Sequence, residues 1–225
     1  MAMGELIAAS TAGDVEQVRV LLQTGIELDA KDAYEALICA AKNGHEAVMQ
    51  ALLEAGAEVD SKNNDAMTAL MVAAQHGQAG AMRVLLEGGA GSDSKDTQGV
   101  TALMVAVMYG QVGAMRVLLE AGSAVDSRDK YEMAPLMHAS ASGHLDAMPV
   151  LLAGSEVDSK DNDGLTALMV AIQYGQAGAM RVLLEAGAAL DSIDNYMQTA
   201  LMRATASTGT RGQCECCWRP GQCWI

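Results

Sequence analysis

The chain contains no phenylalanine and only two tryptophans, and both tryptophans lie within its last eight positions. It also lacks any continuous run of 18 apolar residues, which argues against a transmembrane helix. The apolar half of its composition is built from Ala, Leu, Val and sixteen Met. Because these side chains are small or flexible, they suit a core between thin, closely packed helices better than a wide globular interior.

Basic residues are scarce as well. Lys and Arg number 14 against 28 Asp and Glu, so the formal net charge is −14. Binding to nucleic acid relies on Lys and Arg that displace counterions from phosphates, so we expect no nucleic-acid partner. An anionic membrane surface is disfavoured for the same reason. A basic protein surface is a compatible partner, although acidity also simply keeps a protein soluble.

The N-terminal segment has no basic stretch followed by an apolar core, so no secretory signal is expected. Of the five cysteines, Cys39 stands alone and the other four crowd the C-terminal tail, which is not the pattern of a disulfide framework. These observations predict a cytoplasmic protein.

One segment occurs three times with few changes, beginning at Thr68, Thr101 and Thr166. The first copy reads "TALMVAAQHGQAGAMRVLLEGGA". Its leucine recurs at spacings of 33, 33, 33, 32 and 33 residues, at Leu37, Leu70, Leu103, Leu136, Leu168 and Leu201. Leu6 joins the same frame 31 residues before Leu37. A fixed period of this length indicates an array of stacked units.

Each unit is expected to contain two short helices. Thr68 is a suitable N-cap, and an apolar stripe at helical spacing begins at Leu70. Gly77 allows the chain to turn, and a second stripe begins at Met82 and ends before Gly88. The polar stretch "AGSDSKDTQG" then suits an extended hairpin. Since two short helices cannot bury their own apolar faces, neighbouring units must stack.

This pattern resembles the ankyrin repeat over residues 6–207. "DGLTALMVAIQYGQAGAMRVLLEAGA" matches the family pattern "G-x-T-P-L-H-x-A-A-x-x-G-H-x-x-V-V-x-L-L-L-x-x-G-A" at Gly164, Thr166, Leu168, Ala171, Gly175, Leu183, Leu184, Gly187 and Ala188. The resemblance implies an all-α fold with short β-hairpin loops, a solenoid of stacked helix-turn-helix units. We expect this array over residues 1–207, with six units starting near Leu6, Leu37, Leu70, Leu103, Leu136 and Leu168 and a half unit at Leu201.

The chain departs from the family in the T-P-L-H motif, which reads T-A-L-M here with Met in place of His at Met71, Met104, Met169 and Met202. In the family that His bonds between neighbouring loops. A thioether cannot donate a hydrogen bond, so we expect soft packing in its place. The T-A-L-M variant points to a unicellular eukaryote as the source.

Two regions break the period. In the repeat around Leu136 the capping Thr is replaced by Ala134, and Pro149 is expected inside the second helix, where it would kink the chain. This repeat is either a hinge or specialised contact site, or a unit that has drifted and is tolerated by its neighbours. The second break is the tail, residues 208–225, which follows an unfinished seventh unit.

The tail is expected to be disordered, or to result from a mis-predicted gene end. Cys214 and Cys217 have the spacing of half a zinc site, but only Cys223 remains as a further ligand and no His lies nearby. We therefore predict no metal and no cofactor.

No residues have the spacing of a catalytic site. The four histidines are scattered over different repeats without an acid or nucleophile at catalytic spacing. Aspartates that recur once per unit are expected to form turns, at Asp60, Asp93, Asp126, Asp158 and Asp191. The chain is therefore not expected to be an enzyme.

Columns that differ between repeats are the candidate recognition residues. The resemblance implies that they line a concave face where partner proteins dock, and four of the five Tyr lie in them. Tyr is enriched in interface hot spots, although surface columns also vary simply because nothing constrains them. The candidate partner-binding residues are Asn64, Asp65, Met67, His76, Gln98, Tyr109, Tyr131, Met133, His138, Asp163, Tyr174 and Tyr196.

These observations predict a monomeric, non-catalytic protein–protein interaction scaffold that binds another protein through the concave groove and the hairpin tips. The alternative is an ankyrin fragment of a larger multidomain protein, acting as a spacer or targeting module.

Overall fold

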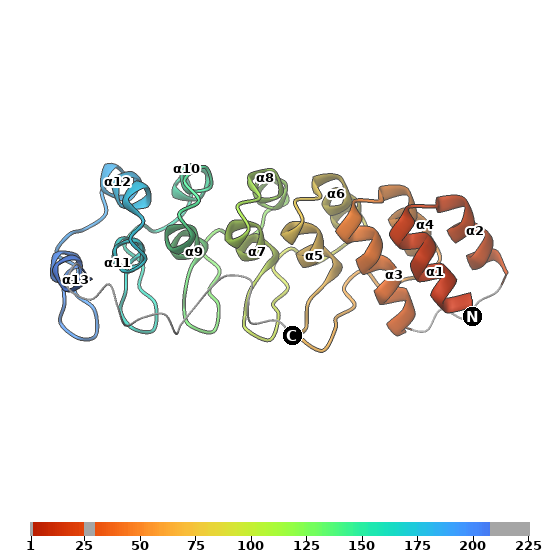
Figure 1. Cartoon of the computed structure of the whole chain (residues 1–225), viewed down its shortest axis with the longest axis horizontal. Helices are drawn as coiled ribbons and strands as arrows, with labels where there is room; N and C mark the ends of the chain where they lie inside the picture. The colour runs from red at the N-terminus through yellow and green to blue at the C-terminus, as the bar shows by residue number, and fades with distance from the viewer. Residues whose placement is uncertain (1, 25–29, 208–225) are drawn as a thin grey trace. The chain divides into compact units, whose positions relative to one another are not determined.

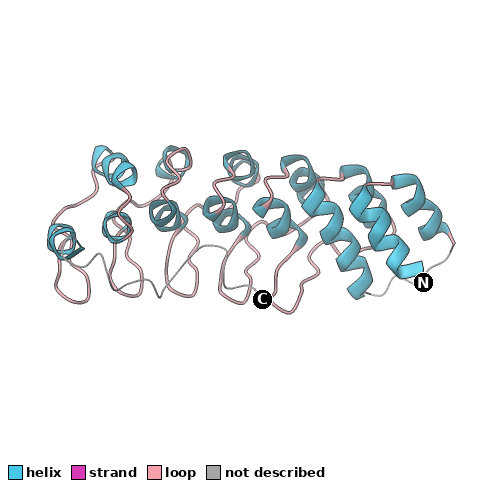
Figure 2. Ribbon diagram, in the orientation of Figure 1, coloured by secondary structure: helices cyan, strands magenta, loops and turns pink. Residues whose placement is uncertain are grey.

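The computed structural model describes residues 2–24 and 30–207, and this part of the chain forms thirteen helices (Figure 1, Figure 2). They are α1 Ala2–Ala12, α2 Val15–Gln23, α3 Ala30–Asn43, α4 Glu46–Glu54, α5 Ala69–Gln75, α6 Ala79–Glu87, α7 Ala102–Met108, α8 Val112–Glu120, α9 Pro135–Ser142, α10 Met148–Leu152, α11 Ala167–Gln173, α12 Ala177–Glu185 and α13 Ala200–Ser207. The prediction of an all-α fold is confirmed. Within the described ranges no strand forms and only one isolated bridge occurs, between Ile193 and Thr199, so the expected β-hairpin loops are turns without a ladder.

The chain divides into two compact units, Met1–Ala124 and Val125–Ile225. In the first unit α1, α3, α5 and α7 lie side by side, and α2, α4, α6 and α8 form a second layer against them (Figure 1). In the second unit α9, α11 and α13 lie side by side, while α10 packs on α9 and α12 on α11. Each repeat thus buries its apolar stripe against its neighbours within its unit, as expected for stacked helix pairs.

The leucine that sets the repeat register is fully buried in the interior repeats, as Leu70, Leu103, Leu136 and Leu168. Met71 and Met82 are also fully buried, which confirms that the two methionines of a repeat belong to the core. Burial of a Leu or Met side chain stabilises the folded state by about 1.5–3 kcal/mol relative to exposure.

The threonine that opens the repeat is the N-cap of the first helix, as predicted. The Thr68 hydroxyl accepts the backbone N–H of Met71 at 3.4 Å, and the same bond recurs at Thr101, Thr166 and Thr199. Gly77 follows the first helix with φ of +68°, a conformation that favours glycine, so the chain turns there into the second helix.

Polar side chains connect neighbouring repeats, which corrects the expectation that soft packing alone replaces the missing histidine. Gln78 donates from Nε2 to the Lys42 carbonyl at 3.1 Å, and Gln111 donates to the Gln75 carbonyl at 3.3 Å. In the second unit Gln176 donates to the Ala141 carbonyl at 3.0 Å. In these repeats the polar link between neighbours is therefore made by the glutamine that precedes the second helix.

The aspartates predicted to form turns do lie in turns at Asp60, Asp93, Asp126 and Asp158, and three of them also bond to the next repeat. Asp60 accepts the backbone N–H of Gly91 at 3.1 Å, Asp93 that of Ala124 at 3.0 Å and Asp158 that of Ala189 at 2.9 Å. The turn prediction is confirmed for these three, and the additional bond from each carboxylate to the amide of the following repeat is a contact that a single unit does not contain.

The repeat of α9 and α10 is irregular, but not in the way expected. The N-cap Ala134 makes no side-chain bond, and Pro135 opens α9 with its fixed φ. The second helix has only five residues and begins at Met148, so Pro149 lies in its first turn rather than in its interior. Since Pro cannot donate an N–H to a preceding turn of helix, residues 145–147 form a turn and the helix begins later.

The last described helix, α13, is poorly covered. Leu201 is 70% and Met202 56% exposed, whereas their counterparts Leu168 and Met169 are at most 1% exposed. In the repeats before it, a second helix covers these positions, and the described chain ends at Ser207 before any such helix. The tail 208–225, with its predicted disorder and its cysteines, lies outside the described residues.

Candidate protein-binding surface

The loops before the first helices α5, α7, α9, α11 and α13 are each closed by one Asn or Asp side chain. Asp129 Oδ1 accepts the backbone N–H of Tyr131 at 2.8 Å and that of Met133 at 3.0 Å. The same pair of bonds occurs in five loops, which we call the tips: residues 63–67, 96–100, 129–133, 161–165 and 194–198. This side chain restrains the backbone of the tip, because its oxygen accepts the N–H groups of the residues two and four positions later.

Neighbouring tips are joined by backbone bonds within each unit. In the first unit the N–H of Thr97 donates to the Asp65 carbonyl at 3.0 Å. In the second unit Asn162 donates to the Tyr131 carbonyl and Asn195 to the Asp163 carbonyl, both at 3.0 Å. The tips of one unit therefore form a continuous edge with a fixed register.

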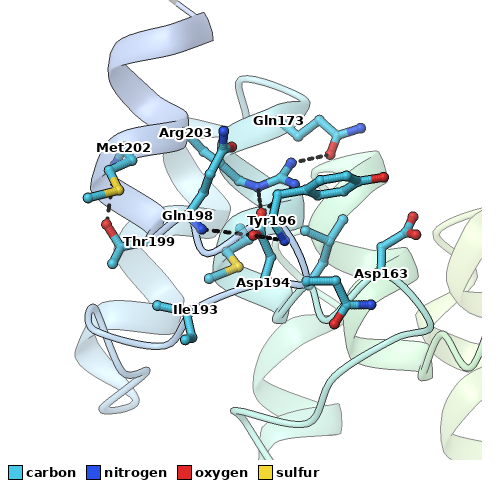
Figure 3. A network of polar contacts seen from close by, with 12 residues as sticks. Asp163, Gln173, Ile193, Asp194, Tyr196, Gln198, Thr199, Met202 and Arg203 are labelled. Atoms are coloured by element: carbon cyan, nitrogen blue, oxygen red, sulfur yellow. Dashed lines mark hydrogen bonds and ion pairs between the residues drawn. The ribbon is translucent and has the colours of Figure 1, made fainter.

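Two tips of the second unit carry an additional ion pair. Arg203 on α13 donates from Nε to Asp194 Oδ2 at 2.6 Å and from Nη1 to Gln173 Oε1 at 3.3 Å (Figure 3). His138 on α9 bonds through Nε2 to Asp129 Oδ2 at 3.0 Å, with both side chains buried. In each case the tip carboxylate is held on one oxygen by the tip backbone and on the other by a side chain nine residues later.

The ion pairs lower the pKa of the carboxylates that they contact. Burial alone would raise the pKa of Asp129, but the hydrogen bond and charge of His138 and the backbone N–H groups outweigh it and hold it below its ordinary value. The pKa of Asp194 is lowered in the same way, by the Gln198 N–H and by Arg203. Nine residues after Asp161 the chain has Val170 in place of His or Arg. Burial, with the charge of Asp163, raises the pKa of Asp161 although the Leu165 and Asp163 N–H groups and the charge of Arg203 act in the other direction.

Most candidate residues lie on the tips or at the C-terminal ends of first helices. Tyr109 is 39% exposed at the end of α7 and Tyr174 38% at the end of α11. Tyr131 and Tyr196 are 56% and 70% exposed on their tips. The other exposed candidates are Asn64, Asp65, His76 and Asp163, and the half-buried ones are Met67, Gln98 and Met133.

His138 is placed differently from the expectation. Only 2% of the residue is exposed, because its ring faces the tip that precedes its own helix and bonds to Asp129 there. Its expected presence on a docking surface was therefore wrong. His138, and Arg203 at the equivalent position of α13, lie against the tip that precedes their helix.

Tyr34 is the one described tyrosine that the candidate set omits, and it is engaged within the fold. Its hydroxyl donates to the Met67 carbonyl at 3.1 Å, between α3 and the tip 63–67. Burial, with the charge of Asp65, raises the pKa of this hydroxyl to about 12.

Several exposed apolar side chains on α12, on α13 and between them in the sequence were absent from the candidate residues. Met197 is exposed at the tip 194–198, and the others are Leu184, Leu190, Ile193, Leu201 and Met202. The half-finished seventh unit was the signal that could have identified them.

Neither a metal-binding cluster nor a membrane-spanning helix occurs within the described ranges. Residues 2–24 and 30–207 bring together no group of three His, Cys, Asp or Glu side chains that could hold a metal ion. None of the helices in these ranges has both the length and the apolar character needed to cross a bilayer.

Known proteins share this arrangement. A family model described as ankyrin repeats (3 copies) matches residues 6–96, 37–129, 85–161 and 136–218. Among solved structures, the chain is similar to the ankyrin repeat domain of Bcl-3, a member of the IkappaB protein family, with 29% sequence identity and a TM-score of 0.79. The similarity covers 89% of this chain and 93% of that domain. Comparison with curated protein sequences gives no match.

The ankyrin repeat is a protein–protein interaction module and not an enzyme fold. The matched segments overlap from residue 6 to residue 218, so they span far more than half of the sequence. The chain therefore belongs to the ankyrin repeat family.

Proposed function

We propose that this chain binds a partner protein, without catalysis, through the tips and the C-terminal ends of its first helices. This surface corresponds to the concave groove and hairpin tips of the family. The observation that supports the proposal is the exposure of four tyrosines at these positions, between 38% and 70%: Tyr109 in the first unit, and Tyr131, Tyr174 and Tyr196 in the second.

Tyrosine suits such a role because it offers a large, rigid contact area with a polar end at low entropic cost. An isolated exposed apolar residue needs no explanation, but a set that recurs at one side of the repeats indicates an interaction site. The chain is acidic overall, and this charge favours a protein partner over nucleic acid or an anionic membrane. We also infer a cytoplasmic monomer. Light scattering on the purified protein tests the oligomeric state, and fractionation of the source cells tests the location.

The test is affinity capture from a cell lysate with the full chain as bait, beside a variant with Ser at all four tyrosines. A partner retained by the first bait and lost from the second is then purified, and its Kd for both baits is measured. We expect the Kd to rise by at least about tenfold, since interface tyrosines commonly contribute more than 1 kcal/mol each.

A matched control keeps fold and binding apart. Each tyrosine of the surface is replaced singly, and Val20→Ser, a change of an exposed side chain on the second helix α2, serves as the control off the surface. Loss of binding with an unchanged thermal midpoint supports the proposal, whereas equal retention by all baits contradicts it. A large fall in the midpoint of the four-fold variant would place these side chains in the core instead.

A second candidate is that the chain is the ankyrin part of a longer protein, acting as a spacer or targeting module. The exposure of Leu201 and Met202 on α13 favours it, because another segment is needed to cover them. Retention of a partner that does not depend on the four tyrosines, but is lost when Leu201 and Met202 are changed to Ser, would favour this candidate.

A further inference from the structure

The two tyrosine-bearing tips of the second unit differ from the tip between them. In the tips 129–133 and 194–198, Tyr131 and Tyr196 lie two residues after the aspartate that opens the tip. In the tip 161–165 the residue at this position is Asp163. At the following position the tyrosine tips have non-glycine residues with positive φ, Glu132 at +61° and Met197 at +59°. The middle tip has Gly164 at +76°.

A side chain with a Cβ is disfavoured in this left-handed region, whereas glycine adopts it freely. The tyrosine tips therefore hold a backbone conformation that their own sequence opposes. Interactions elsewhere in the fold offset this cost, such as the bond that Arg128 donates to the Glu132 carbonyl at 2.9 Å.

The ion pairs described above occur in these same two tips. His138 contacts the carboxylate of the tip 129–133, and Arg203 contacts that of the tip 194–198. The corresponding residue of the middle repeat is Val170. In the first unit the tip 96–100 follows the middle pattern, with Gly99 at +77° and Val105.

The first tip, residues 63–67, separates charge from backbone conformation. Its residue at positive φ is Ala66, at +60°. The residue that opens this tip is the neutral Asn63, and the residue nine positions later is Val72 in place of His or Arg. A neutral amide offers no charge to pair. The anchoring His or Arg side chain therefore accompanies a buried carboxylate whose tip lacks glycine.

We propose that His138 and Arg203 are positioning residues that hold Tyr131 and Tyr196 in their binding orientation by anchoring the tip carboxylates. Each carboxylate accepts two tip N–H groups on Oδ1 and the anchoring side chain on Oδ2, so the turn cannot open without breaking a charge-assisted bond. The inference deepens the proposed function, on which it rests for the purpose of the tyrosines.

The test measures amide hydrogen exchange of the full chain at the tips and needs no partner, so it can fail or succeed independently of the capture experiment. In His138→Val, which installs the residue of the sister repeats, exchange of the Tyr131 and Met133 N–H groups should accelerate by at least about tenfold. The Asp163 and Leu165 N–H groups of the middle tip should keep their rates, because their carboxylate has no such anchor to lose.

His138→Arg is the rescue variant, since the last repeat uses Arg at this place, and it should restore slow exchange at Tyr131. Glu132→Gly combined with His138→Val should lose less protection than His138→Val alone, because glycine removes the need for the anchor. Arg203→Val repeats the test at Tyr196 and Gln198 should His138→Val fail to fold.

Equal acceleration at all tips, or none at Tyr131 and Tyr196, would overturn the proposal by making the ion pairs a matter of global stability. Failure of His138→Arg to restore protection in a folded protein would overturn it as well, since the imidazole would then act through its shape. When a partner is in hand, His138→Val should weaken its binding although every tyrosine is present.

Discussion

The repeats α9/α10 and α11/α12 lie in the same unit and hold equivalent segments by different interactions. α11 begins at the capping Thr166 and its second helix runs for nine residues, whereas α9 follows the non-capping Ala134 and α10 has five residues. On the other hand, α9 anchors its tip through His138, where α11 has Val170. The comparison teaches that a repeat can lose a cap and part of a helix while its tip stays anchored by a buried ion pair.

The largest expected change in stability comes from truncating a buried leucine in each of the two second helices, α12 and α10. Leu183 in α12 and Leu151 in α10 are equivalent and fully buried. Leu183→Ala should destabilise the protein by about 2–5 kcal/mol, because a regular helix pair collapses little around the cavity. Leu151→Ala should cost less, since a five-residue helix after a turn relaxes more easily. Denaturant unfolding of both variants checks this, and equal losses would show that α10 is packed as rigidly as α12.

The next largest change in stability is expected when the N-cap residues of α11 and α9 are exchanged. Thr166→Ala removes the hydroxyl that accepts the Met169 N–H, and should cost about 1 kcal/mol. Ala134→Thr should stabilise by a similar amount, because Pro135 already presets the first turn of α9 and only the cap is missing. Thermal unfolding of the two variants and of their combination measures both changes. A lower midpoint for Ala134→Thr would show that the Ala134 site has no room for the hydroxyl.

A smaller gain is expected from Pro149→Arg, which restores the residue found in the sister repeats. With an N–H at this position the helix can begin near Leu145, as α12 begins at Ala177. Since Pro149 already lies in the first turn, where Pro is tolerated, the gain should stay at about 1 kcal/mol or below. Circular dichroism at 222 nm should show added helix, and an unchanged spectrum with a lower midpoint would contradict the expectation.

The helices and their register could be predicted from the sequence because their causes are local. Thr68 and its equivalents cap, the leucine column lies on the buried stripe, and Gly77 turns the chain, all within one repeat. The methionines were recognised as core by the same spacing. Nothing in these inferences required contact between residues far apart in sequence.

The links between repeats could not be predicted in this way. Gln78 reaches the Lys42 carbonyl and Asp60 reaches the Gly91 amide, over 36 and 31 residues, and neither bond exists within one repeat. His138 was taken for a surface residue because its position varies between repeats, although the two residues there other than Cys and Val, His138 and Arg203, bond to the tip carboxylate. An Asp followed nine residues later by His or Arg is the signal that would have identified this pair.

The smallest effect concerns pH and returns to the same two repeats. The raised pKa of Asp161 means that the folded state binds this proton more tightly than the unfolded chain, so its contribution to stability is full in acid and is lost as pH rises through the folded pKa. The lowered pKa of Asp129 acts in the opposite direction: its contribution is present above the ordinary carboxyl value, near pH 4, and is lost as pH falls through the lower folded value. Carboxyl carbon NMR titration of the folded chain should therefore find Asp161 titrating above Asp129. In Val170→Arg the order should change, because a guanidinium beside Asp161 supplies what His138 supplies beside Asp129. Persistence of the high pKa of Asp161 in that variant would mean that the arginine does not reach the tip, and that the column of α11 cannot anchor it.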